Sequence, residues 1–349
     1  MRKEIKCGNV LIGGTAPISV QSMTNTNTAD VEATINQIKA LQLAGCDIVR
    51  VAVPNMEAAA AIKEIKANIE IPLVVDIHFD YKLALESIKN GADKVRINPG
   101  NIGAEHKVKE VVNACKSYGV PIRIGVNGGS LDPKILKKHG KMCAEALYES
   151  MIEHVEILER NGFSDMVLSV KSTDMHLNVA TNQMLFKHTN YPIHIGVTES
   201  GNQLEGIVKS SVGIGHLLMQ GIGNTLRVSL TDHPVEEIKV GKQILRVAGL
   251  LNDRIEIISC PTCGRTKIDL ITLVNQVKER IGSIKTPIKV AVMGCAVNGP
   301  GEAKEADIGI AGGDGCAILF KKGIILRKVA EADIVDELEK EVKKIIEEV

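Results

Sequence analysis

The chain has 349 residues, which is enough for two domains or for one large barrel with an appendage. Lys and Arg together number 42, as do Asp and Glu, and this zero net charge argues against a generally basic nucleic-acid binder. Only 2% of the residues are aromatic, which disfavours a stacking platform for single-stranded nucleic acid.

No apolar run of about 18 residues and no N-terminal signal segment is present, so we expect no membrane span. Eight cysteines in a chain of this length are too few for a secreted disulfide scaffold. We therefore expect a cytoplasmic protein whose thiols are reduced.

Short runs rich in Val and Ile recur through the first part of the chain and alternate with amphipathic helical segments such as Ala58–Ala67 and His106–Tyr118. This alternation indicates βαβ units and a parallel sheet. Eight units in about 250 residues predict a closed TIM-type (β/α)8 barrel. An open doubly wound sheet is the alternative, but no Gly-x-Gly-x-x-Gly fingerprint follows the first strand. The predicted strands are Ile18–Met23, Asp47–Val53, Leu73–His78, Lys94–Asn98, Ile122–Val126, Met166–Val170, Ile193–Val197 and Thr225–Leu230.

The barrel pattern stops near Gly249–Asn252, and shorter mixed elements follow. A smaller α+β domain of about 100 residues lies within the usual range of domain sizes. We therefore predict a barrel over residues 1–252 and an α+β domain over 253–349. The elements predicted for the second domain are strands at Ile255–Ser259, Ile288–Met293, Ile308–Ala311, Ala317–Phe320 and Ile324–Lys328, and helices at Lys267–Ile281 and Asp333–Glu347.

Polar side chains interrupt the predicted barrel strands at alternate positions, so within one strand they share a face. Parallel strands buried on both sides should be almost wholly apolar, and the polar face must therefore point into the barrel. Most of these residues lie toward the carboxyl ends of their strands, where barrel active sites lie. The candidates are Arg50, His78, Arg96, Asn98, Arg123, Asn127, Lys171, His194, Thr198, Arg227 and Ser229.

Four Arg and one Lys that converge on one mouth would repel one another without an anion. A small polyanion such as phosphate or diphosphate suits them, because an Arg fork binds its oxygens bidentately. The alternative is internal ion pairing with Asp76, Asp80 and Glu199, but the cations outnumber these carboxylates. His78 and His194 are weaker candidates, since a lone strand His is often only structural.

A C-x-x-C knuckle formed by Cys260 and Cys263 directly follows a predicted strand, and Cys295 lies in a second segment rich in Gly and Pro. A structural zinc site normally needs four Cys ligands, or three Cys and one His, and residues 255–349 contain no His. A [4Fe–4S] cluster held by three Cys leaves one iron for a different ligand or for substrate. A redox dithiol formed by Cys260 and Cys263 is the remaining alternative.

These segments resemble those of a known family. Ser259–Thr266 and Val292–Ala303, with the barrel segments Asp47–Pro54 and Val95–Asn101, are similar to segments of bacterial 4-hydroxy-3-methylbut-2-enyl diphosphate synthases. The resemblance covers essentially the whole chain. It implies an iron–sulfur oxidoreductase of the non-mevalonate isoprenoid (terpenoid) pathway. The implied reaction is reductive ring opening and dehydration of 2-C-methyl-D-erythritol 2,4-cyclodiphosphate to 1-hydroxy-2-methyl-2-butenyl 4-diphosphate, with electrons from flavodoxin or ferredoxin.

The resemblance also implies roles for particular residues. One [4Fe–4S] cluster per chain would be bound by Cys260, Cys263, Cys295 and, unusually, Glu302, which would also be catalytic. Glu199 would lie near the reacting hydroxyl as an acid or base, and the inward cations with Asn127 and Ser229 would hold the cyclic diphosphate. Members of the family are homodimers in which the cluster domain of one subunit caps the barrel of the other.

A function of a different class is the competing hypothesis. The barrel could bind a phosphorylated substrate without redox chemistry, as a transferase or isomerase does, while the C-terminal domain carried a structural zinc ion. A role in binding alone is less favoured, because it does not explain the buried polar face of the barrel.

Overall fold

The structure is a computed structural model that describes residues 1–128, 131, 133–296 and 303–348. The chain divides into two compact units, Met1–Leu250 and Leu251–Val349. The first unit ends two residues before residue 252, where the sequence pattern placed the end of the barrel.

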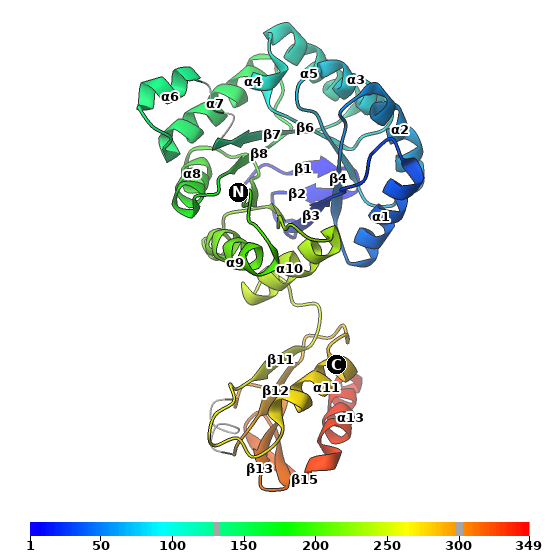
Figure 1. The fold of residues 1–349 in the computed structure, drawn as a ribbon, viewed down its shortest axis with the longest axis vertical. Helices are drawn as coiled ribbons and strands as arrows, with labels where there is room; N and C mark the ends of the chain where they lie inside the picture. The colour runs from blue at the N-terminus through cyan, green and yellow to red at the C-terminus, as the bar shows by residue number, and fades with distance from the viewer. Residues whose placement is uncertain (129–130, 132, 297–302, 349) are drawn as a thin grey trace. The chain divides into compact units, whose positions relative to one another are not determined.

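Eight parallel strands form the first unit (Figure 1), and they confirm the predicted TIM-type barrel. The strands are hydrogen-bonded in the order β8-β7-β6-β5-β4-β3-β10-β9. A parallel bridge between Leu168 of β8 and Ile193, the residue before β9, closes the ring. The strands are β3 (Ser19–Met23), β4 (Ile48–Ala52), β5 (Leu73–Asp76), β6 (Lys94–Ile97), β7 (Ile122–Asn127), β8 (Met166–Lys171), β9 (His194–Gly196) and β10 (Thr225–Arg227).

Helices surround the strands, and side-chain caps fix where several of them begin. The side chains of Asp30, Asn55, Asp80, Asp174 and Asn202 each accept a hydrogen bond from a backbone N–H in the first turn. A cap of this kind stabilises a helix by about 1 kcal/mol. No helix among the described residues is long and apolar enough to cross a membrane. The helices are α1 (Val31–Leu43), α2 (Met56–Ala67), α3 (Tyr81–Lys89), α4 (Pro99–Ile102), α5 (Glu105–Tyr118), α6 (Pro133–His139), α7 (Ala144–Arg160), α8 (Met175–His188), α9 (Gln203–Met219) and α10 (Pro234–Val247).

An N-terminal hairpin that the sequence pattern did not indicate closes the opposite end of the barrel from the predicted site. Its strands, β1 (Ile5–Cys7) and β2 (Val10–Ile12), are antiparallel. The buried side chains of this hairpin pack against residues at the beginnings of three barrel strands, namely Ile48, Val74 and Val167. Three-residue strands are too short to show a periodicity, which is why they were missed.

The second unit is an α+β domain, as predicted. Its five-stranded sheet has the order β11-β12-β13-β14-β15, with the first three strands parallel and the last two antiparallel to their neighbours. Two helices pack on one face of the sheet around a core that includes Val277, Val290 and Leu338. The elements are β11 (Glu256–Ser259), α11 (Leu270–Ile281), β12 (Lys289–Met293), β13 (Ile308–Gly313), β14 (Cys316–Lys321), β15 (Ile324–Ala330) and α13 (Ile334–Glu347).

Candidate active site

Five cationic side chains gather inside the barrel, most of them from the later part of their strands, while Arg123 comes from near the beginning of β7. The register places Arg96 of β6 beside Arg123 of β7, and β4, β8 and β10 supply the others. Arg123 is 2% exposed and Lys171 is 7% exposed, so the charges lie out of contact with bulk water. The full set is Arg50, Arg96, Arg123, Lys171 and Arg227.

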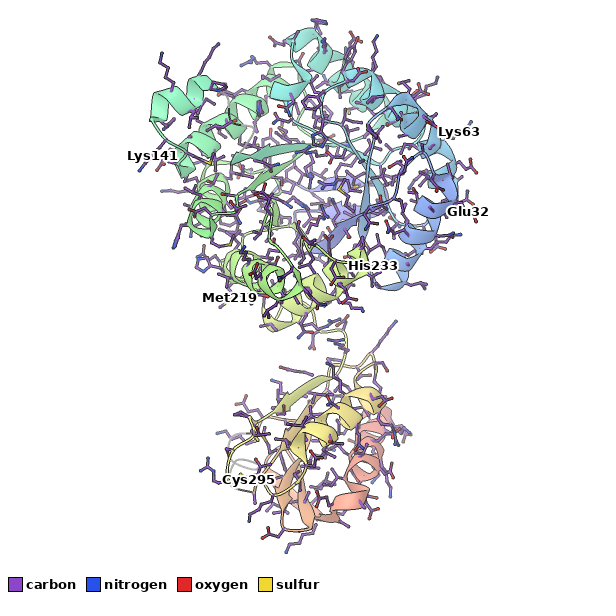
Figure 2. All side chains as sticks on the ribbon, in the orientation of Figure 1. Glu32, Lys63, Lys141, Met219, His233 and Cys295 are labelled. Atoms are coloured by element: carbon purple, nitrogen blue, oxygen red, sulfur yellow. The ribbon has the colours of Figure 1, made fainter. Side chains whose placement is uncertain are left out.

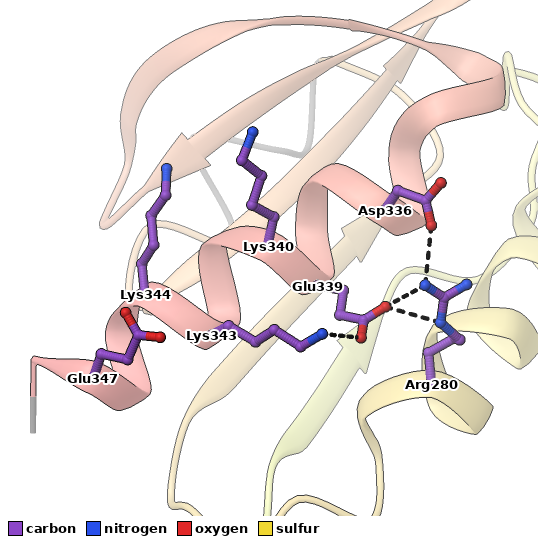
Figure 3. A pocket seen from close by; sticks show the side chains of 7 residues that line it. All are labelled: Arg280, Asp336, Glu339, Lys340, Lys343, Lys344 and Glu347. Carbon is purple, nitrogen blue, oxygen red and sulfur yellow. Dashed lines mark hydrogen bonds and ion pairs between the residues drawn. The ribbon is translucent and has the colours of Figure 1, made fainter.

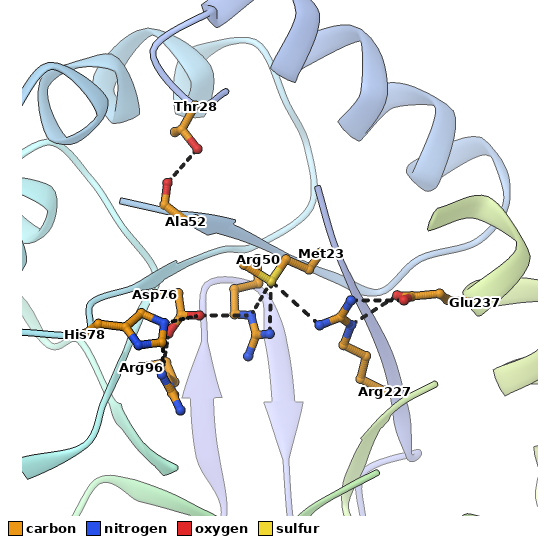
Figure 4. Close-up of polar contacts among 9 residues, drawn as sticks. All are labelled: Met23, Thr28, Arg50, Ala52, Asp76, His78, Arg96, Arg227 and Glu237. Carbon is orange, nitrogen blue, oxygen red and sulfur yellow. Dashed lines mark hydrogen bonds and ion pairs between the residues drawn. The ribbon is translucent and has the colours of Figure 1, made fainter. Parts of the chain in front are cut away.

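Two buried carboxylates neutralise part of this charge (Figure 4). Asp76 of β5 lies 3.0 Å from Arg96 Nη1 and 3.8 Å from Arg50 Nε. Burial opposes ionisation of Asp76, but the charges of Arg50 and Arg96 outweigh that effect and hold its pKa well below the usual range. Glu237 of α10 forms a bidentate pair with Arg227. When all five groups are protonated, as a bound anion favours, they outnumber these two carboxylates by three.

The predicted ion pairs are therefore only partly present. Asp76 pairs as the alternative hypothesis required, whereas Asp80 caps α3 and Glu199 is exposed. Glu237 was not anticipated, because an acidic residue in the first turn of a helix is usually exposed and serves only the helix dipole. Its burial follows from the packing of α10 on the barrel and has no signal in the sequence.

Several nitrogens of the cation set have no hydrogen-bond partner among the described residues. They are Nε and Nη1 of Arg123 and Nε of Arg96, all fully buried. Burial, followed by repulsion from Arg123 and Arg227, lowers the pKa of Lys171 well below its usual value, and burial lowers the pKa of Arg50 to about 10. Buried cations without partners are costly, and an anionic ligand removes that cost.

Two glycines on the inward face make room for this set. A Cβ atom at Gly125 would lie 2.7 Å from Arg96 Nε, and one at Gly196 would lie 2.5 Å from Lys171 Nζ. Neither position has a left-handed backbone, so the requirement for glycine comes from close approach. The long cationic side chains therefore cross neighbouring strands at these two points.

The remaining predicted polar residues lie at two depths: most lie at or beyond the carboxyl ends of their strands, and His194 lies at the beginning of its strand. His78, Asn98, Thr198 and Ser229 lie just beyond the ends of their strands, which are shorter than predicted. The His78 side chain is 54% exposed, and its Nε2 atom lies 3.5 Å from Asp76 and 3.4 Å from Arg96. Asn98 accepts a hydrogen bond from Gly100 N and begins α4. Asn127 ends β7 opposite Lys171.

His194 lies deeper than the other candidates. It is fully buried at the beginning of β9 opposite Thr225, and both ring nitrogens lack a partner among the described residues. Burial and the nearby cations lower its pKa well below the usual value, so the ring is neutral. Lys94 is also fully buried at the beginning of its strand, and its spacing of two residues from Arg96 is the signal in the sequence that could have found it.

Glu199 has an unusual backbone. It follows β9 at the mouth of the barrel, is exposed, and has a φ angle of 52°. Only Glu199 and Lys322 among the described non-glycine residues have positive φ. A carboxylate held in a left-handed conformation at a barrel mouth is typical of a functional position.

The cysteines proposed as ligands in the C-terminal domain lie on two segments that hydrogen bonds hold together, and Figure 2 labels Cys295 on one of them. Gly294, the residue before Cys295, donates its backbone N–H to Cys260 Sγ at 3.2 Å, and its carbonyl accepts from Lys267 N at 2.9 Å. Cys295 is buried, Cys260 is half-buried and Cys263 is exposed. Backbone and side-chain hydrogen bonds from Arg265 lower the pKa of the Cys263 thiol, which favours the thiolate that binds metals.

The thiol donors suit an iron–sulfur cluster better than a single metal ion. No three His, Cys, Asp or Glu side chains among the described residues are arranged to hold one ion. The thiols are soft donors, and a backbone N–H directed at Cys260 Sγ is a common feature around Fe–S sulfurs. Glu302, the fourth ligand expected from the resemblance, lies outside the described residues.

A charged surface hollow on α11 and α13 is not a comparable site (Figure 3). Arg280 pairs there with Asp336 and Glu339, and Lys343 also pairs with Glu339. Each cation drawn in this hollow has a carboxylate partner in the C-terminal domain. The hollow is therefore a network that ties the two helices together and has no excess charge for an anion.

A parallel barrel with buried, incompletely neutralised cations at its mouth is typical of enzymes that act on phosphorylated substrates. Residues 2–242 match the family model described as "GcpE TIM-barrel domain". Residues 256–344 match the model described as "GcpE protein C-terminal domain". The chain therefore belongs to the GcpE family, the 4-hydroxy-3-methylbut-2-en-1-yl diphosphate synthases, and is an enzyme, as its resemblance implied.

Relatives match over nearly their whole length. The 4-hydroxy-3-methylbut-2-en-1-yl diphosphate synthase (flavodoxin) of Caldanaerobacter subterraneus subsp. tengcongensis is 57% identical, over 100% of this chain and 98% of the relative. The enzyme of the same name from Clostridium perfringens is 58% identical, over 98% of each chain. A solved structure of Yersinia pestis dihydropteroate synthase covers 71% of this chain and 100% of its own, with a TM-score of 0.51 and 11% identity, and shows only the shared barrel fold.

Proposed function

We propose that the enzyme opens the ring of 2-C-methyl-D-erythritol 2,4-cyclodiphosphate reductively and releases water, giving 1-hydroxy-2-methyl-2-butenyl 4-diphosphate. The observation that carries this proposal is the excess of positive charge buried at the barrel mouth of a member of this family. Two electrons and one proton enter for each substrate, one water leaves, and the phosphate oxygen released from carbon gains a negative charge.

The cations divide into two groups with different parts in binding. Arg50, Arg96 and Arg227 are oriented by Asp76 or Glu237, so their positions are fixed before substrate arrives. Arg123 has unpartnered N–H groups, and Lys171 lies across Gly196 with its charge disfavoured by burial. We assign both groups to the diphosphate, with Arg123 and Lys171 contributing the donors that are free for it.

The same charges favour the chemical step. Cleavage of the carbon–oxygen bond places new charge on phosphate, and cations that are already fixed in a water-poor barrel stabilise that charge without reorganising. We assign Glu199 to carry the proton that leaves with the hydroxyl as water, on the basis of its place and backbone at the mouth. His78, Asn98, Asn127, His194, Thr198 and Ser229 complete the predicted substrate contacts.

The C-terminal domain supplies the redox part of the proposal. Cys260, Cys263 and Cys295 would hold one [4Fe–4S] cluster, with Glu302 as the fourth ligand from outside the described residues. When bound, the cluster passes electrons to the substrate. Hydrogen bonds from Arg265 favour the thiolate of Cys263, and Gly294 N donates a hydrogen bond to Cys260 Sγ. Flavodoxin, which appears in the names of the relatives, is the proposed electron donor, with ferredoxin as the alternative.

We also propose a homodimer in which the cluster domain of one subunit caps the barrel of the other. The barrel has cations but no redox group, and the C-terminal domain has thiols but no comparable cation set among its described residues, so neither completes the chemistry alone. All eight cysteines are free, which supports placing the enzyme in the reducing cytoplasm.

Metal analysis of anaerobically purified enzyme tests this function against the zinc alternative. The proposal predicts a brown protein with about four iron and four sulfide per chain. A colourless protein with about one zinc per chain would instead support a non-redox transferase or isomerase.

Gly125→Ala should weaken substrate binding without unfolding the barrel. The three atoms nearest to the added methyl group would all belong to the Arg96 guanidinium, so the substitution should turn that side chain away from the pocket. We expect the Kd for the cyclic diphosphate to rise about tenfold, a typical effect of one displaced charged contact. Calorimetry measures the change. Gly215→Ala is the control, since a Cβ there has no atom within 4 Å. Equal Kd values in the two variants would contradict the placement of Arg96.

Binding should take up protons. In the free enzyme, burial and neighbouring cations lower the pKa of Lys171, which favours its neutral form. A bound diphosphate favours the charged form and raises that pKa, so a proton enters with the ligand and affinity falls as pH rises. Calorimetry in buffers of different ionisation enthalpy measures the uptake, and Lys171→Met should reduce it. Proton release on binding, or uptake that Lys171→Met leaves unchanged, would contradict this role.

A further inference from the structure

Glu237 is the most heavily hydrogen-bonded carboxylate near the cation set. Its two oxygens accept from Arg227 Nε at 3.0 Å, Arg227 Nη2 at 2.9 Å, Ser22 Oγ at 2.7 Å and Leu230 N at 3.2 Å. The residue is 2% exposed and lies on α10, outside the ring of strands. Neither the reaction nor the helix cap of α10 requires a buried carboxylate there.

The pairing decides which edge of the Arg227 guanidinium stays available. Glu237 occupies the edge formed by Nε and Nη2. The Nη1 atom is left on the other side, 3.6 Å from Met23 Sδ, and the same sulfur lies 2.9 Å from Arg50 Nη2 (Figure 4). The free edge of Arg227 therefore points toward Arg50 and the rest of the cation set. A guanidinium has a planar fork, so fixing one edge fixes the direction of the other.

We infer that Glu237 is a positioning residue that sets the direction from which Arg227 binds the substrate diphosphate. The inference rests on the proposed function, because it takes Arg227 to be a substrate ligand. Glu237 does not touch the substrate itself. It holds Arg227 from behind, at the point where β3, β10 and the segment after β10 meet through Ser22, Arg227 and Leu230. Without that carboxylate the guanidinium could rotate, and its bidentate contact with phosphate would be lost.

A merely structural carboxylate would give a different result, and a double-mutant cycle separates the two roles. The variants are Glu237→Gln, Arg227→Gln and the two combined. Glu237→Gln keeps the side-chain volume but turns one acceptor into a donor facing Arg227. Glu236→Gln is the matched control, because Glu236 lies on the same turn and its side chain pairs with the exposed Lys239 at 2.6 Å, away from the cation set. The Kd of the cyclic diphosphate is measured by calorimetry on anaerobic, cluster-loaded enzyme without reductant, with thermal unfolding of each variant alongside.

A positioning role predicts that Glu237→Gln raises the Kd about tenfold in the parent enzyme but less than about twofold when Arg227 is already Gln. Under reducing conditions KM should rise in the same way, with kcat within about twofold of the parent. Glu236→Gln should leave both constants unchanged. An unchanged Kd in Glu237→Gln, or an effect of the same size with and without Arg227, would overturn the inference.

The cycle also distinguishes this inference from the proposed function. If Arg227→Gln binds the cyclic diphosphate as the parent does, the anion pocket itself is wrongly placed. If Glu237→Gln does not fold, Ser22→Ala tests the same contact more gently, because it removes one donor to Glu237 Oε2. That variant should raise the Kd about two- to threefold in the parent and not at all in Arg227→Gln. Equal effects in both backgrounds would count against positioning through Arg227.

Discussion

Cys263→Ser is expected to lose most of its bound iron and all turnover, while the barrel stays folded. A serine hydroxyl is a hard and weak ligand compared with a thiolate, so one corner of the cluster would have no firm bond. The barrel core is built within residues 1–250, and Cys263 is exposed in the other unit, so the barrel does not depend on this thiol. Iron analysis, a turnover assay with reduced flavodoxin and far-ultraviolet circular dichroism measure the three consequences.

Cys316→Ser is the control for this variant. Cys316 belongs to the same domain, at the beginning of β14, and has no proposed role as a ligand. We expect it to keep its iron and its turnover. Full iron content in Cys263→Ser, or equal iron loss in Cys316→Ser, would contradict the ligand assignment.

Lys171→Met is expected to weaken substrate binding and to stabilise the free enzyme at the same time. The variant keeps most of the side-chain volume and removes a buried amine whose protonation is opposed by burial and by its neighbours Arg123 and Arg227. Loss of a charge-assisted contact should cost binding about 1.5–3 kcal/mol, or roughly ten- to a hundredfold in Kd. Removal of this amine should raise Tm at neutral pH, because a lysine whose pKa is lowered on folding opposes folding below its ordinary pKa.

Calorimetry and thermal unfolding in the absence of ligand test these opposite effects. Lys187→Met, on the exposed side of α8, is the control and should change neither quantity. The cluster spectrum should match the parent in both variants. Parental affinity in Lys171→Met would remove Lys171 from the anion pocket, and a lower Tm would show that its charge is already compensated.

The sequence predicted the barrel well because its signals are local and repeated. Apolar strand runs alternate with amphipathic helices, and side chains two residues apart share a face, so Arg96 and Arg123 could be directed inward before their neighbours were known. The register then places those two residues opposite each other. Convergence of cations follows from the closed ring of strands, and so it was predictable once eight strands were counted.

Other features depend on packing between distant segments and have no local signal. Glu237 is a first-turn helix acid by sequence, and only the packing of α10 makes it the partner of Arg227. The N-terminal hairpin packs against the beginnings of β4, β5 and β8, and its three-residue strands carry no periodicity. His78 and Ser229 lie beyond their strands because β5 and β10 end earlier than their apolar runs suggested.

The most direct test of the central claim follows the substrate itself. Cluster-loaded enzyme, reduced flavodoxin and 2-C-methyl-D-erythritol 2,4-cyclodiphosphate are mixed under anaerobic conditions, and phosphorus NMR records the diphosphate signals while absorbance records flavodoxin oxidation. We expect loss of the cyclic signals, growth of a linear diphosphate, and about two electrons taken from flavodoxin for each product. A cyclic diphosphate that stays intact beside a fully loaded, reduced enzyme, or one that opens without consuming electrons, would contradict it.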